Sequence, residues 1–293
     1  MTEQRLIPTP DGRQLEVRIA GSADGRTLLF HHGTPGTGLP SPTWVAAAVA
    51  RDLRYVCIVR PGYGDSTRNA GRSVADVASD VSTVLDALGV TRALTLGISG
   101  GGPHALATAA LLPDRIAAAA TIGSVAPYEA DGLDFLAGMG AENVEEFGAA
   151  VAGTSELVAF LDAAAPAFAT ATGTQIAGAF GDLIADVDRK ALTGEMADSI
   201  AADIRASLRN GIWGWHDDDL AFTRPWGFDL ASIRVPVTIW QGEQDRMVPY
   251  AHGRWLAGQI PGVHARLLAE HGHLSLQADS IGIVFDELAA RPG

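Results

Sequence analysis

The stretch Arg92-Ala93-Leu94-Thr95-Leu96-Gly97-Ile98-Ser99-Gly100-Gly101-Gly102-Pro103-His104-Ala105-Leu106 decides how this chain is interpreted. It opens with a short apolar run, residues 93–96, that predicts a buried strand. It continues into an Ala- and Leu-rich run, residues 104–112, that predicts a helix. Between the two runs lies a G-x-S-x-G motif centred on Ser99. A serine at so sharp a strand-to-helix turn is held in a strained backbone conformation, with its Oγ exposed at the top of the sheet.

The glycines of this motif have a steric role. Side chains at positions 97 and 101 would clash in the tight turn, and glycine removes them. The N–H of Gly100 points to where an oxyanion would form, and the following helix adds its positive end. A Gly/Ser loop that merely caps a helix carries the same letters. The chemical interpretation therefore requires a base, an acid and a second oxyanion donor elsewhere in the chain.

Length and composition limit the function classes. The chain has 293 residues, of which 47% are hydrophobic, and this size suits one large α/β domain or one domain with an insertion. The formal net charge is −13, and Lys190 is the only lysine. This balance argues against nucleic acid or an anionic membrane as a partner. It favours a small-molecule substrate that is neutral or cationic.

Cysteine content and hydropathy bear on the cellular compartment in which the protein is expected. The single cysteine, Cys57, lies within an apolar run and is expected to be a core residue, so no intramolecular disulfide can form. Residues 1–10 are polar and contain two prolines, which is unlike a signal peptide. No apolar run reaches membrane-spanning length. The cytoplasm is the simplest expectation.

Strand and helix patterns alternate along most of the chain. Residues 15–20 alternate apolar and polar side chains, which predicts a half-exposed edge strand. Ser73, with Asp76 three residues later, predicts the start of a helix that ends at Gly89. This alternation predicts an α/β fold with a mostly parallel sheet flanked by helices. Strands are expected at 15–20, 27–31, 55–59, 93–96, 115–123, 235–240 and 265–269, and helices at 44–51, 73–88, 104–112, 250–259 and 274–290.

The composition and the hydrophobic pattern of the sequence change after Ser124. From residue 125 to residue 214 the strand patterns vanish, and Ala, Gly, Asp and Glu occur with helical spacing. We interpret residues 125–214 as a helical cap inserted into a core formed by residues 1–124 and 215–293. In parallel sheets, sites lie at the carboxyl ends of the strands. The cap is expected to cover that end.

A nucleophilic serine needs a histidine base and a carboxylate that orients it. In a sheet of this kind the expected chain order is Ser, then Asp or Glu, then His. Asp245 lies in the loop after the strand at 235–240, and we prefer it to Glu243 because a shorter, stiffer side chain suits a fixed role. His273 follows the last strand and the flexible Gly272, and we prefer it to His271.

The second oxyanion donor should come from the loop after the strand at 27–31. Pro35 has no N–H, so the donor is either Gly33 or Thr34, and we favour Thr34. A plain turn at this loop is the alternative interpretation.

Together these residues resemble the α/β-hydrolase superfamily, over nearly the whole chain outside the cap. The resemblance implies Ser99 as nucleophile, Asp245 as acid and His273 as base, with no cofactor required. It also implies an oxyanion hole made by the N–H groups of Thr34 and Gly100. The matching pieces are His32-Gly33-Thr34-Pro35-Gly36, Arg60-Pro61-Gly62-Tyr63-Gly64-Asp65-Ser66, Gly97-Ile98-Ser99-Gly100-Gly101, Gly242-Glu243-Gln244-Asp245 and Gly272-His273.

Some residues depart from particular branches of this superfamily. Where the proline-iminopeptidase-like branch has a second glycine after its first histidine and a tryptophan after the nucleophile, this chain has Thr34 and Gly100. Epoxide hydrolases and haloalkane dehalogenases use an aspartate nucleophile, because water can cleave an ester intermediate but not a serine ether. Ser99 therefore favours acyl transfer to water.

Two acidic stretches invite other interpretations. Residues 213–219 read Trp-Gly-Trp-His-Asp-Asp-Asp, which suggests a metal site less than it suggests a solvated turn or helix start. We therefore expect no metal there. Nearby aromatic residues are expected to pack the return of the cap to the sheet, with one or two lining an acyl pocket. Glu142, Glu145 and Glu146 suggest a solvated helix face more than a site for a substrate amine.

The sequence as a whole predicts a serine hydrolase that cleaves carboxylic esters through an acyl-enzyme. An aminopeptidase-like amidase is the alternative within the same class. A non-catalytic ligand-binding protein on the same scaffold is the alternative outside it, because a fold does not guarantee chemistry. The expected substrate is a small ester or amide. The oligomeric state is left open.

Overall fold

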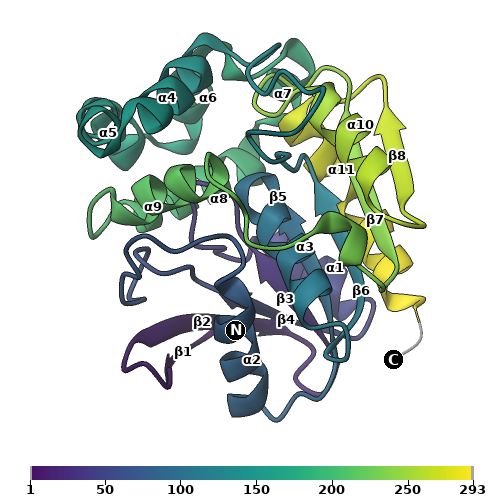
Figure 1. The fold of residues 1–293 in the computed structure, drawn as a ribbon. Helices are drawn as coiled ribbons and strands as arrows, with labels where there is room; N and C mark the ends of the chain where they lie inside the picture. The colour runs from purple at the N-terminus through teal and green to yellow at the C-terminus, as the bar shows by residue number, and fades with distance from the viewer. Residues whose placement is uncertain (1, 292–293) are drawn as a thin grey trace.

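An eight-stranded sheet forms the centre of the computed structural model, which describes residues 2–291 (Figure 1). The strand order is β1-β2-β4-β3-β5-β6-β7-β8. Strand β2 runs antiparallel to β1 and β4, and all other neighbours are parallel. This confirms the predicted α/β fold. The strands are β1 (Glu3–Pro8), β2 (Gln14–Gly21), β3 (Arg26–His31), β4 (Leu53–Ile58), β5 (Ala93–Ile98), β6 (Ile116–Ile122), β7 (Val237–Gly242) and β8 (His264–Leu268).

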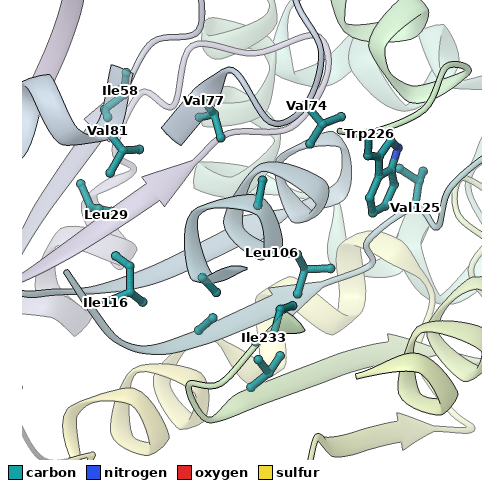
Figure 2. Packing of buried hydrophobic residues seen from close by; sticks show 14 of the residues in the cluster. Leu29, Ile58, Val74, Val77, Val81, Leu106, Ile116, Val125, Trp226 and Ile233 are labelled. Carbon is teal, nitrogen blue, oxygen red and sulfur yellow. The ribbon is translucent and has the colours of Figure 1, made fainter. Parts of the chain in front are cut away.

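Helices cover both faces of the sheet. Helices α1 (Pro42–Val49) and α11 (His273–Ala289) pack on one face and share an apolar cluster with the strands. Helices α2 (Val77–Ala87), α3 (Gly102–Leu111) and α10 (Tyr250–Gln259) contribute to a cluster on the other face. In Figure 2, side chains of α2 and α3 gather against strand residues of this cluster. Strands buried on both faces are continuous apolar runs, as β5 and β6 are.

The edge of the sheet differs from the expectation. Residues 15–20 were expected to form a half-exposed edge strand, but β1 occupies the edge and β2 lies inside it. The polar residues that made β2 alternate are buried, because Glu16 and Arg18 form an ion pair with each other at 2.7 Å. An alternating pattern cannot distinguish a solvated polar face from one that is internally paired.

The start of α2 also differs. The expected helix began at Ser73, whereas α2 begins at Val77. The Asp76 carboxylate accepts hydrogen bonds from the N–H and the hydroxyl of Ser73, at 2.6 and 2.9 Å. The two side chains thus form a local hydrogen-bonded turn just before the helix. Such a turn competes with helix formation at Ser73.

A helical region separates β6 from β7, and within the described chain no strand interrupts it. Figure 1 shows α4 to α6 standing beyond one end of the sheet. Val59 and Tyr63 of the loop after β4 also pack into an apolar cluster shared by the helices of this region. Its elements are α4 (Ala141–Ala152), α5 (Thr154–Thr170), α6 (Gly173–Ala179), α7 (Asp186–Ala191), α8 (Gly194–Ser207) and α9 (Trp213–Phe222). In residues 2–291 no helix is both long enough and apolar enough to cross a membrane.

Candidate active site

Ser99 occupies the sharp turn between β5 and α3. Its φ angle is +51°, in the left-handed region that a residue with a side chain rarely adopts. A Cβ at Gly97 would lie 2.2 Å from the carbonyl oxygen of Gly101, and a Cβ at Gly101 would lie 2.0 Å from that of His31. Backbone therefore fills the space on both sides of the turn. The clash within the turn is thus confirmed for Gly97, whereas Gly101 is needed because the end of β3 passes against it.

His273 and Asp245 form a buried pair. Nδ1 of His273 lies 2.7 Å from Oδ2 of Asp245, and at most 3% of either side chain is exposed. The other oxygen of Asp245 accepts the N–H groups of Met247 and Val248 at 2.9 and 2.8 Å, and Gln241 Nε2 donates to Oδ2 at 3.1 Å. The carboxylate is thus fixed in the orientation that meets the imidazole.

The pKa of His273 results from opposing effects. Burial lowers it, but the charge and hydrogen bond of Asp245, together with the charge of Asp188, raise it above its ordinary value of 6.5. The charged carboxylates favour the imidazolium form, which a general base reaches when it accepts a proton.

The alternative acid and base lie elsewhere. Glu243 is exposed, and its N–H donates to the carbonyl of Leu268. His271 is one-quarter exposed, with Nε2 3.3 Å from the Asp279 carboxylate. Neither residue lines the cavity that Ser99 and His273 share.

One cavity of about 430 Å³ brings the proposed residues together. Ser99, His273, Thr34 and Gly100 all line it, and Asp245 lies behind the His273 ring. Gly33, the alternative oxyanion donor, lines it as well. The walls are mainly aliphatic and aromatic, and they include Phe147, Phe168, Phe180, Met196, Ile200, Trp215, Phe222 and Leu274.

The two proposed oxyanion donors are neighbours in space. A Cβ at Gly100 would lie 2.3 Å from Oγ1 of Thr34 and 2.9 Å from the ring of Phe222. The loop that follows β3 therefore closes directly over the turn that carries Ser99. The Thr34–Pro35 peptide bond is cis.

The acidic run at 217–219 was expected to be a solvated turn or helix start. It does lie in a helix, but the expectation that it is solvated was wrong. All three aspartates are buried on α9. The Asp218 carboxylate accepts hydrogen bonds from Arg60, Arg72, Tyr63 and Thr34, at 2.5 to 2.9 Å for the shortest bond of each. Burial raises the pKa of Asp218, but the two guanidinium groups hold it well below its ordinary range.

A sequence signal for this burial existed. The aspartates stand between Trp215 and the apolar residues Leu220 and Phe222, which is unlike a solvated turn. Among the residues that the structure describes, no three His, Cys, Asp or Glu side chains are grouped as a metal ion would require.

Two further carboxylates of the helical region bind backbone of the core. Asp203 of α8 accepts the N–H groups of Thr37, Gly38 and Leu39 at 3.0, 3.3 and 2.9 Å. Asp188 of α7 accepts the first N–H groups of α11, including that of His273. Sequence reasoning missed both residues, because nothing in their local pattern distinguishes them from surface carboxylates.

A carboxyl pair also lies in the cavity wall. Glu146 of α4 accepts a hydrogen bond from the indole of Trp215 at 2.6 Å, and it is buried, contrary to the solvated face that was expected. Burial raises its pKa to about 7, and the pKa of Asp219 is likewise raised by burial and by repulsion from Glu146. At neutral pH this pair carries less negative charge than two free carboxylates would.

Comparison with known proteins identifies the family. The model of the alpha/beta hydrolase fold matches residues 26–277. The chain belongs to the alpha/beta hydrolase fold family. It is 28% identical to a non-heme haloperoxidase of Rhodococcus erythropolis over 285 residues, covering 94% of this chain and 96% of that protein. It is 27% identical to a non-heme chloroperoxidase of Streptomyces lividans, covering 84% and 83%.

Solved structures share the fold across the whole chain. The esterase RhEst1 from Rhodococcus sp. ECU1013 superposes with a TM-score of 0.73 at 22% identity, covering 99% of both chains. Epoxide hydrolase A from Mycobacterium thermoresistibile reaches 0.72 at 19% identity, covering 100% of this chain and 99% of its own. At these identities the likeness concerns the fold alone. The hydrolase activity of the family applies to this chain.

Proposed function

We propose that this alpha/beta hydrolase is a serine hydrolase that cleaves carboxylic esters through an acyl-enzyme. One observation carries the proposal. Ser99 shares a cavity with His273, and the imidazole of His273 is hydrogen-bonded to the buried carboxylate of Asp245. A hydroxyl, a base and an orienting acid are the three parts that nucleophilic acyl transfer requires.

In this mechanism the Ser99 Oγ attacks the ester carbonyl carbon while Nε2 of His273 takes the serine proton. The Asp245 carboxylate accepts a hydrogen bond from Nδ1–H of His273 and stabilises the imidazolium that forms. The N–H groups of Thr34 and Gly100 stabilise the tetrahedral oxyanion. The intermediate then expels the alcohol, which receives the proton from His273. A water molecule, deprotonated by the same histidine, releases the acid and restores Ser99. No cofactor takes part in this scheme.

We propose that residues 125–214 act as a cap on a core formed by residues 1–124 and 215–293. The support is the cavity itself, because residues of α4, α5 and α8 make much of its wall. A cap in this position excludes water and sets the shape available to the substrate.

The proposed substrate is a small ester with uncharged, apolar groups. The walls are mostly apolar, and among the described residues that line the cavity none is a lysine or an arginine. Glu142, Glu146, Glu195, Asp203 and Asp219 do line it. A carboxylate on the substrate would find no cation to pair with, and burying it unpaired would be costly. An aminoacyl amide, whose ammonium group could approach Glu146, is the alternative substrate.

A second acyl acceptor is suggested by the relatives. One relative is named a non-heme haloperoxidase and another a non-heme chloroperoxidase, and a protein of Acinetobacter calcoaceticus, 34% identical over 126 residues, is named a bifunctional esterase/perhydrolase. In this chain, hydrogen peroxide could attack the same acyl-enzyme in place of water, releasing a peracid and restoring Ser99. A monochlorodimedone assay with acetate, peroxide and bromide would measure this activity beside ester hydrolysis.

A fluorophosphonate probe tests the proposed nucleophile. The probe phosphonylates only an activated hydroxyl, whose oxygen displaces fluoride from phosphorus, so we expect a single adduct on the peptide that contains Ser99. The adduct should be absent in Ser99→Ala and strongly reduced in His273→Ala. Ser199 lines the same cavity but lies within the regular helix α8 rather than at a strained turn, so Ser199→Ala is the matched control and should label like the wild type.

An ester series tests the reaction. We expect turnover of p-nitrophenyl acetate and butyrate, with Ser99→Ala reduced by roughly 10⁴-fold and still folded. No adduct at saturating probe and no turnover would favour the non-catalytic binding protein. An adduct without ester turnover, but with turnover of aminoacyl amides, would favour the amidase. A cytoplasmic location stays a prediction.

A further inference from the structure

The helix that carries His273 begins without a neighbouring side chain that accepts its first N–H groups. The hydroxyl of Ser275 accepts only the N–H of Gly272, at 2.8 Å, just before the helix. His273, Leu274 and Ser275 are the first three residues of α11, and their N–H groups have no partner within the helix. The preceding residue, Gly272, has no side chain that could accept them. Such a helix end, buried as it is here, needs an acceptor from elsewhere in the chain.

Asp188 of α7 is that acceptor. Its Oδ2 accepts the N–H of His273 at 3.0 Å. Its Oδ1 accepts the N–H groups of Leu274 and Ser275 at 2.9 and 2.8 Å, and the Ser275 hydroxyl at 2.9 Å. The side chain is completely buried, and a Cβ at Gly272 would lie 2.3 Å from it. A carboxylate 85 positions earlier in the chain thus performs the capping that is usually local.

This contact has an electrostatic consequence for the base. The N-terminus of a helix carries a partial positive charge, which disfavours an imidazolium at its first residue. The buried carboxylate of Asp188 offsets that charge, and it raises the pKa of His273 alongside Asp245.

Other charged residues that contact α11 do so away from His273: Arg51 pairs with Asp286 and Arg266 pairs with Glu287, toward the C-terminal end of the helix. Helix α1 and strands β6 and β7 carry no charged residue. The remaining charged residues of α7, which are Asp186, Arg189 and Lys190, are exposed.

We propose that Asp188 is a positioning residue for His273: it fixes the start of α11 and supplies charge that stabilises the imidazolium during acyl transfer. The inference rests on the proposed function. It makes the helical region a part of the catalytic arrangement rather than only a cover, since the carboxylate is delivered from α7. Small substrates should therefore depend on α7 as much as bulky ones do.

The test is Asp188→Asn, which is nearly isosteric, measured with p-nitrophenyl acetate across pH 5 to 9. We expect the plateau kcat to fall by about tenfold, and the midpoint of the acid limb of kcat/KM to move down by up to about one pH unit, because the imidazolium loses a stabilising charge. KM should change little. Asp186→Asn is the matched control, because it makes the same change at an exposed position of the same helix, and its profile should equal that of the wild type.

The outcomes separate the possible failures. If kcat falls while the midpoint stays in place, Asp188 is only a structural cap, and the charge role is overturned. If both quantities equal the wild type, the whole inference is wrong. A wild type that neither turns over esters nor labels at Ser99 refutes the proposed function instead.

A second variant covers the case in which Asp188→Asn does not fold. Asp188→Ala purified in formate leaves room for a small anion in place of the missing carboxylate, and dialysis of the formate is then the variable. We expect formate to raise kcat and to return the acid-limb midpoint toward the wild-type value. A midpoint that is independent of formate in a folded, formate-stabilised protein would contradict the proposal.

Discussion

The hydroxyl of Thr34 donates a hydrogen bond to Oδ2 of Asp218 at 2.7 Å, across 184 positions of sequence. The same carboxylate binds Arg60 and Arg72, which are themselves buried. Helix α9 thereby fixes the loop that we propose as one side of the oxyanion hole. Protein stability and the geometry around the Ser99 turn therefore depend on one ion cluster.

Asp218→Asn should be strongly destabilising. It leaves two buried guanidinium groups without their counter-charge, and breaking a buried ion pair in this way costs about 3–5 kcal/mol. Urea denaturation followed by circular dichroism would measure the loss in free energy of unfolding. Asp217→Asn is the comparison. Asp217 contacts the His216 ring at 2.9 Å as well as Arg68, but Arg68, its guanidinium partner, is one-third exposed and can be hydrated. A loss no larger for Asp218 than for Asp217 would show that the cluster does not support the fold.

Asp245→Asn should lower kcat by about 10⁴-fold while the protein stays folded, because an amide at this position favours the wrong imidazole tautomer. Glu243→Gln, an exposed change in the same loop, should leave kcat near the wild-type value. Steady-state kinetics with an activated ester would check both. If Glu243→Gln is the inactive variant, the acid is misassigned.

His273→Ala should abolish turnover, whereas His271→Ala should retain most of it. The His273 ring contacts Asp245 and lines the cavity, whereas the His271 ring faces Asp279. The same ester assay, with thermal melting as a control for folding, would compare the two variants. The reverse pattern would transfer the role of base to His271.

The rate should rise with pH through the titration of His273. Only the neutral imidazole can accept the serine proton, and the pKa is raised above 6.5, so the midpoint of kcat/KM should lie above 6.5 and activity should be lost as the pH falls below it. Glu146 also titrates near pH 7. A profile of Glu146→Gln separates the two groups, because its acid limb should persist. A flat profile in the wild type, with acylation shown to be rate-limiting, would exclude His273 as the base.

Gly101→Ala should destabilise the protein by roughly 3 kcal/mol or more, because the new methyl group meets the carbonyl oxygen of His31 in closely packed surroundings. Gly148→Ala provides the opposite case. Gly148 lies within α4, and no other atom would lie within 4 Å of a Cβ added there, so replacing the glycine should stabilise the protein by about 0.5–1 kcal/mol. Thermal unfolding of both variants would reveal the contrast. Equal stability of the two would mean that the turn at Ser99 can relax.

The sequence by itself determined the class of fold and the place of the Ser99 turn. Strands β3 to β8 and most of their helices were predictable within a few residues, because an apolar run and a helical side-chain period are both local properties of the sequence. The need for glycine at position 97 is also local, since the backbone of Gly101 and Gly102 supplies the crowding there, whereas at position 101 the crowding comes from the backbone of His31 on another strand. Chain order alone was sufficient to propose Asp245 and His273, although it left Glu243 and His271 open.

Only the tertiary structure decided which polar groups are buried and what they bind. The sequence could not reveal that Glu16 pairs with Arg18 inside the sheet, that Asp218 meets Arg60 from 158 positions away, or that Asp188 caps the helix of His273. The physical reason is that a carboxylate is tolerated in the interior only where donors converge on it. Those donors come from segments distant in the chain, so the local pattern around an aspartate looks the same whether it faces water or an arginine.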